Sequence, residues 1–137
     1  MKLNDKDRNA VVNHRLRRAK ETLQEAEDNI KLNHWHAATN RLYYACYYAA
    51  SGLLVNNGYL AKTHSGVFGL LGKHFISKGI IGKEQGIFYG KLFELRQKGD
   101  YDDWFAMDEK NVLPLVVPAG EFISLVEKLI QNSKNLI

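Results

Sequence analysis

Arg96 is the residue of this chain whose chemistry is easiest to assign, and Asp100 and Tyr101 follow it closely. A guanidinium is planar and always charged, so Arg96 could hold a phosphate through two parallel hydrogen bonds, with Tyr101 beside it. A structural alternative is that Arg96 and Asp100, four residues apart, form an ion pair on a helix that contributes roughly 0.2–0.5 kcal/mol. The residue types alone favour the ion pair.

The polar segment 62–66 offers the second candidate group, since it holds Lys62 and His64 just before a predicted helix. Thr63 or Ser65 is a suitable N-cap for that helix. If the segment folds towards the arginine site, His64 could exchange a proton near neutral pH, and Lys62 could add a positive charge. The structural alternative is that a histidine next to a cap only supports the loop.

Other kinds of site are not supported by the residue spacing. His34 and His36 are two apart, which points them about 200° from each other on a helix, and no acidic residue completes a ligand set. Gly66, Gly69 and Gly72 recur every three residues inside a predicted helix, which is not the arrangement of a phosphate-binding loop. We expect no metal site and no cofactor.

Composition indicates one ordinary domain that spans residues 1–137. The chain is 45% hydrophobic and 25% charged, and its one cysteine, Cys46, excludes an internal disulfide. Residues 1–10 contain no apolar signal segment, so we expect a cytoplasmic protein. The net charge is +4, and Lys and Arg are in excess over Asp and Glu mainly in residues 1–20 and 62–98. This distribution permits an anionic partner without establishing one.

Helical periodicity runs through most of the chain, and no segment alternates with period two. The most apolar stretch, 34–55, carries hydrophobic or aromatic side chains on nearly every face, so it should be the central helix and should be too interrupted for a membrane span. We predict an all-α, up-and-down bundle of about five helices, with residues 1–8 frayed. The predicted helices cover 8–32, 34–55, about 64–78, 83–99 (closed by Gly99, with Ile87, Phe88, Leu92 and Leu95 inward) and 118–132, after a loop at 100–110.

The ordered set of motifs resembles the HEPN-domain family (higher eukaryotes and prokaryotes nucleotide-binding), in particular its small stand-alone prokaryotic members associated with minimal nucleotidyltransferases. The resemblance covers about residues 15–130. It implies a helical bundle, a homodimer and a toxin–antitoxin pair, and many members are metal-independent endoribonucleases that use an Arg, four to six residues and then a His. The motifs that carry the resemblance are Arg41-Leu42-Tyr43-Tyr44-Ala45 with Tyr47, Lys62-Thr63-His64-Ser65-Gly66, Arg96 and Asp100-Tyr101.

The chain departs from that pattern at the histidine, because Tyr101 stands in its place and no histidine follows His74. An ordinary phenol, with a pKa near 10, stays protonated at pH 7 and is a poor proton acceptor. We therefore predict a module that binds nucleotide, RNA or a partner protein through Arg96, Asp100, Tyr101, Lys62 and His64. The alternative is an endoribonuclease toxin in which Arg96 stabilises charge on phosphorus and His64 or Tyr101 accepts the proton.

The expected partners follow from the same resemblance. They are a second copy of the chain, a minimal nucleotidyltransferase antitoxin, and RNA or a nucleotide, with no membrane and no metal. The residues add one hint for the homodimer, since the aromatic side chains exceed what a five-helix core can bury. They are Tyr101, Trp104, Phe105 and some of the tyrosines of 34–55. A third hypothesis is a bundle that serves only self-association or docking.

Overall fold

The computed structural model describes the backbone of residues 3–101 and 107–135, and the side chains of residues 3–98 and 107–133. Every regular element of those residues is a helix, so the predicted all-α bundle is confirmed. None of these helices is both long enough and apolar enough to cross a membrane. The elements are α1 (Asp5–Lys31), α2 (Trp35–Asn56), α3 (His64–Leu71) with a π-helical turn (Gly72–Ile76), α4 (Lys83–Tyr101), α5 (Glu109–Val112) with a 3-10 turn (Leu113–Leu115), and α6 (Val116–Asn135).

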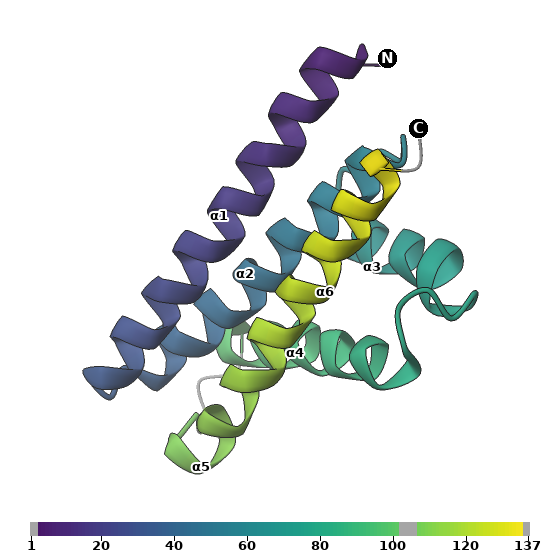
Figure 1. Ribbon diagram of the computed structural model, residues 1–137. Helices are drawn as coiled ribbons and strands as arrows, with labels where there is room; N and C mark the ends of the chain where they lie inside the picture. The colour runs from purple at the N-terminus through teal and green to yellow at the C-terminus, as the bar shows by residue number, and fades with distance from the viewer. Residues whose placement is uncertain (1–2, 102–106, 136–137) are drawn as a thin grey trace.

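Helices α1 and α2 form an antiparallel hairpin, as predicted (Figure 1). The connection is short because Asn33 adopts a left-handed conformation, with a φ of 61°. Gly52 on α2 lets the two helices approach closely, since a Cβ at that position would lie only 3.2 Å from the Cβ of Arg15. The predicted start of α1 at residue 8 is wrong, because Asn4 accepts a hydrogen bond from the backbone of Asp7 and the helix begins at Asp5.

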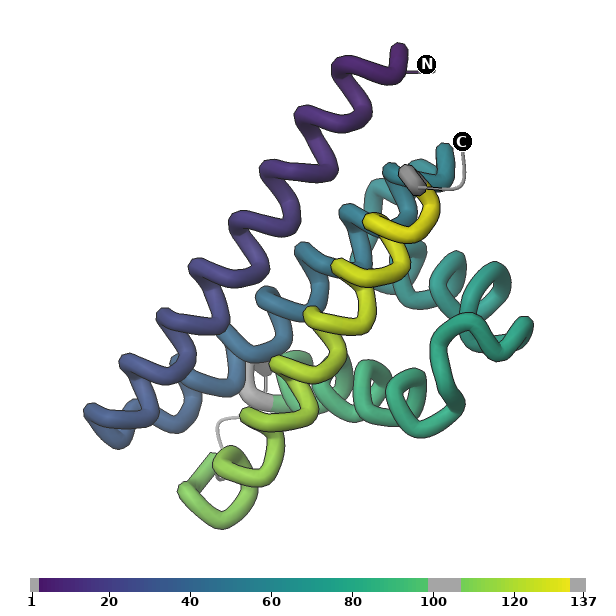
Figure 2. The backbone as a smooth tube through the Cα atoms, viewed as in Figure 1, coloured from purple at the N-terminus to yellow at the C-terminus, as the bar shows by residue number. Residues whose placement is uncertain are grey.

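Helix α2 is the central element, and α1, α3, α4 and α6 all contact it. Figure 2 shows the axes of α1, α2 and α6 lying roughly parallel, with α1 opposite to the other two in chain direction, while α4 crosses them. Cys46 is fully buried in α2, 3.9 Å from the carbonyl oxygen of Ala119 on α6, so it is a core residue. The buried side chains of α2 are Ala38, Thr39, Leu42, Tyr43, Ala45, Cys46, Ala49, Ala50, Leu53 and Leu54.

The ends and one face of α4 differ from the prediction. Gly99 does not close this helix, which continues to Tyr101. The predicted inward side chain of Ile87 is 63% exposed, and Tyr89 is buried instead. The Tyr89 ring packs between Tyr43 of α2 and Phe122 of α6. The predicted inward face of this helix counted only aliphatic and phenylalanine side chains, so it left Tyr89 out.

The chain enters α6 irregularly, through the short helix α5 and a 3-10 turn. Pro118 lies in the first turn of α6, where a missing N–H breaks no helical hydrogen bond. Asp108 caps the short helix α5, accepting from the backbone of Asn111, and does not cap α6. The predicted loop at 100–110 is wrong at its beginning, where α4 still continues. Trp104 and Phe105 lie outside the described residues.

Candidate functional site

Arg96 lies against the tyrosine face of α2, by which we mean Tyr43, Tyr44, Tyr47 and Tyr48. Its guanidinium carbon is 5.2 Å from the centre of the Tyr43 ring and 5.8 Å from that of Tyr44. Its Nη1 donates a hydrogen bond of 3.5 Å to the hydroxyl of Tyr44. The side chain is only partly buried, so the packing positions the cation without sealing it from solvent.

His64 reaches the same face from α3. Thr63 caps α3 by accepting from the backbone N–H of Gly66 at 2.9 Å, as the sequence predicted, and this fixes His64 as the first residue of the helix. The imidazole centre is 4.4 Å from the centre of the Tyr47 ring, and its Nδ1 lies 2.9 Å from the hydroxyl oxygen of Tyr43. The residue that follows the loop before α3 therefore packs onto the same tyrosine face as Arg96.

Two tyrosine rings connect the guanidinium and the imidazole. Tyr43 and Tyr44 each contact Arg96, and the centre of each ring lies within 5.7 Å of the His64 ring centre. Because the Tyr43 ring is fully buried and the Tyr44 ring is partly exposed, the first fixes the geometry and the second is available to a ligand. The structure thus brings together two residues that are 32 positions apart in the sequence.

Burial and charge set the protonation states at this site. Partial burial lowers the pKa of His64, and the positive charge of Arg96 lowers it further, so the imidazole is neutral at pH 7. Burial raises the pKa of Tyr43 to about 12, so this phenol keeps its proton throughout the physiological range. The site therefore combines a permanent cation, a neutral imidazole and a neutral phenol.

Two further arginines lie over the same tyrosine face. The guanidinium carbon of Arg41 is 5.2 Å from the centre of the Tyr44 ring, and that of Arg18, on α1, is 5.3 Å from the centre of the Tyr48 ring. Glu25 is 3.4 Å from Nη1 of Arg41 and so compensates part of this charge. The face is basic and aromatic over about two turns of α2.

The other predicted site residues are not joined to this cluster by the described contacts. Lys62 is exposed, two residues before His64. The side chains of Asp100 and Tyr101 lie outside the described residues, and so does the ion pair between Arg96 and Asp100 that the sequence allowed. Among the described residues, no group of three or more His, Cys, Asp or Glu side chains could hold a metal ion.

Sequence reasoning missed the role of the tyrosines. The pairs Tyr43 with Tyr47 and Tyr44 with Tyr48, at helical spacing, were interpreted as buried rings with polar tips and in part as a surplus for a dimer interface. The available signal was the tyrosine pair inside the segment 41–45, which was used only for the family resemblance. Contacts to Arg96 and His64 depend on how α3 and α4 pack onto α2, which spacing along one helix does not specify.

Comparison with known proteins agrees with this fold. The chain is 36% identical over 132 residues to a UPF0332 protein of Thermotoga maritima, a match that covers 96% of this chain and 98% of that protein. It is 27% identical over 114 residues to a protein of Methanocaldococcus jannaschii named "putative toxin", covering 83% of this chain and 84% of the relative. A second protein of that organism with the same kind of name is 25% identical over 122 residues, covering 89% of this chain and 82% of that protein.

The crystal structure of TT1696 from Thermus thermophilus has a similar fold, with a TM-score of 0.74. The match covers 85% of this chain and 96% of that chain, and at 18% identity it concerns the fold alone. The model of the HEPN domain matches residues 12–129, which include the tyrosine face, His64 and Arg96. This protein therefore belongs to the HEPN domain family.

Proposed function

We propose that this protein is a toxin-type HEPN module that binds RNA or a nucleotide at Arg96 and His64 and does not cut it. The observation that carries the proposal is that both side chains lie against Tyr43 and Tyr44 while remaining partly accessible. A phosphate is held by the charge and fork geometry of Arg96. The archaeal relatives with toxin names support the toxin-type assignment.

The tyrosine face suits the rest of such a ligand. Unpaired RNA bases stack on aromatic side chains, and Tyr44 and Tyr47 are both partly exposed. Arg41 extends the positive charge beyond Arg96 along the same face. A strand that places one phosphate on Arg96 can therefore set a neighbouring base against a tyrosine ring. Lys62, Asp100 and Tyr101 are the other ligand-binding residues of the proposal.

The competing function is that of a metal-independent endoribonuclease, and one observation favours it. The pKa of His64 is lowered, so the neutral imidazole needed to accept a 2'-hydroxyl proton is present at pH 7. Arg96 would then stabilise the charge that develops on phosphorus. In this competing function Tyr101, which stands in the position of the family histidine, is the alternative proton acceptor to His64.

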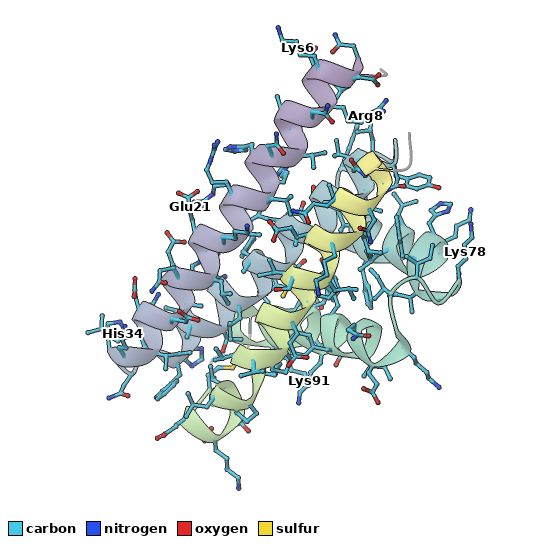
Figure 3. All side chains as sticks on the ribbon, in the orientation of Figure 1. Lys6, Arg8, Glu21, His34, Lys78 and Lys91 are labelled. Atoms are coloured by element: carbon cyan, nitrogen blue, oxygen red, sulfur yellow. The ribbon has the colours of Figure 1, made fainter. Side chains whose placement is uncertain are left out.

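Incubating the purified protein with a labelled single-stranded RNA in EDTA separates the two functions. We expect the RNA to stay intact and to bind, as measured by fluorescence anisotropy, and Arg96→Ala to weaken binding. Arg8→Ala is the matched control, since it removes the same charge near the N-terminal end of α1, away from α4 (Figure 3). RNA cleavage that is lost in Arg96→Ala and in His64→Phe would establish the nuclease instead. Equal RNA binding by wild type and Arg96→Ala would contradict both the binding module and the endoribonuclease, because both depend on Arg96.

We also propose that the protein forms a homodimer and pairs with a minimal nucleotidyltransferase antitoxin. The family resemblance is the main support. The surface adds one observation, since Leu113 in the 3-10 turn and Val117 in the first turn of α6, four residues apart, are 41% and 68% exposed. Light scattering at micromolar concentration tests the dimer, and a monomer would contradict it. Co-purification with the product of a neighbouring nucleotidyltransferase gene tests the second partner.

A further inference from the structure

The contact between Tyr43 and His64 decides which nitrogen of the imidazole carries its proton. The hydroxyl oxygen of Tyr43 is 2.9 Å from Nδ1 of His64, which is a well-formed hydrogen bond. A neutral imidazole has one N–H and one bare nitrogen, so Nδ1 either accepts from the phenol or donates to it. If Nδ1 accepts the hydrogen bond, the other ring nitrogen, Nε2, carries the N–H. If Nδ1 donates it, Nε2 is bare.

The environment of Tyr43 selects the direction. Its side chain is fully buried and keeps its proton, because burial raises its pKa to about 12. If Nδ1 carried the proton, the buried O–H would lose this acceptor, which is costly. A phenol that donates to a bare imidazole nitrogen satisfies both groups.

The buried hydroxyl of Tyr89 is the other group that could compete for the Tyr43 proton. It forms no hydrogen bond by distance and angle among the described residues. By geometry, Nδ1 of His64 is therefore the hydrogen-bond partner of the Tyr43 hydroxyl among the described residues.

We propose that Tyr43 is a positioning residue that holds His64 in the neutral tautomer with the proton on Nε2. Among the described residues nothing hydrogen-bonds to Nε2, and the ring is partly exposed. The imidazole therefore offers a ligand an N–H donor and no bare nitrogen, and the guanidinium of Arg96 also offers donors only. Such a pair matches an oxyanion, here a phosphate group, and lacks the proton acceptor that cleavage needs.

This inference rests on the proposed function for its ligand, and it gives a physical reason why the site binds without cutting. It also assigns separate roles to two tyrosines of α2. Tyr43 sets the proton through its hydroxyl, while Tyr47 holds the plane of the His64 ring by a ring contact of 4.4 Å between centres. No hydrogen bond joins the Tyr47 hydroxyl to His64 among the described contacts, so the two hydroxyls are distinguishable by mutation.

Nitrogen NMR of the histidine side chains tests the tautomer directly. Long-range proton–nitrogen spectra of the full chain, labelled with ¹⁵N and recorded without ligand between pH 7.5 and 8, separate a protonated from a bare ring nitrogen. His64→Phe identifies the signals of His64 by their loss. We expect wild type to show Nε2 protonated and Nδ1 bare. We expect Tyr43→Phe to shift both nitrogens towards an average of the two tautomers, and Tyr47→Phe to leave them unchanged.

Two results would overturn the inference. One is a wild-type spectrum with the proton on Nδ1 of His64, which needs no variant and is therefore unaffected if Tyr43→Phe folds poorly. The other is a folded Tyr43→Phe whose His64 signals match those of wild type. Because no RNA is present, the outcome is independent of the binding assay: an Nε2–H tautomer in a protein that binds no RNA would refute the proposed function and leave the role of Tyr43 standing.

Discussion

Replacing Tyr43 with phenylalanine removes one hydroxyl from the core and leaves the ring in place. The oxygen that is lost lies 2.9 Å from Nδ1 of His64, on a side chain with no exposed surface. A hydrogen bond of this kind contributes about 0.5–1.5 kcal/mol net. Since His64 is partly exposed, water can replace the phenol as its partner. We therefore expect the unfolding free energy to fall by about 0.5–1 kcal/mol, and Tm by about 2–4 °C.

A double-mutant cycle isolates the contribution of this hydrogen bond. Urea unfolding of wild type, Tyr43→Phe, His64→Phe and the double variant should give a coupling free energy of about 0.5–1 kcal/mol. Tyr47→Phe is the control, because its ring contacts the same imidazole and its hydroxyl makes no described bond to it. A coupling energy of zero, or equal losses for Tyr43→Phe and Tyr47→Phe, would refute the role given to the Tyr43 hydroxyl.

Three other consequences are open to measurement. Because the pKa of His64 is lowered in the folded protein, the unfolded chain binds the proton of this imidazole more readily, and the unfolding free energy should fall as pH drops below about 6.5. Urea unfolding at pH 8 and pH 5 measures this fall, which should be smaller in His64→Phe than in wild type. Gly52→Leu should cost about 1–3 kcal/mol in thermal unfolding, because a Cβ there lies 3.2 Å from Arg15, whereas Gly69→Ala, with nothing within 4 Å, should stabilise α3 by up to about 1 kcal/mol. In RNA binding measured over a salt series, Arg96→Ala should reduce the slope of log affinity against log salt by about 1; an unchanged slope would mean that Arg96 meets no phosphate.

Much of the fold follows from hydrophobic spacing. Apolar residues along 12–30 predict α1, and the apolar stretch at 34–55 correctly predicts the central helix, because both patterns extend over many turns. Helix ends are less predictable. Gly99 has the residue type of a helix end, but α4 continues past it, since one glycine costs only about 1 kcal/mol inside a helix with other contacts.

The site was predictable in part. Arg96 and His64 were identified by residue type and by resemblance. The role of His64 was made conditional on the segment 62–66 folding towards Arg96, and both side chains do contact Tyr43. The hydroxyl of Tyr43 was not identified, because its role comes from three helices that meet in space. Lys62, Asp100 and Tyr101 remain predictions of function.

An NMR titration with a short single-stranded RNA tests the central claim most directly. The ¹⁵N-labelled protein would be followed at the side-chain N–H of Arg96 and the imidazole of His64, together with every backbone amide. We predict that these two side chains and the amides around Tyr44 shift as the RNA saturates the protein. If the RNA binds while Arg96 and His64 keep their free positions, and the shifts fall on the basic N-terminal part of α1 instead, the binding site proposed on the tyrosine face is contradicted.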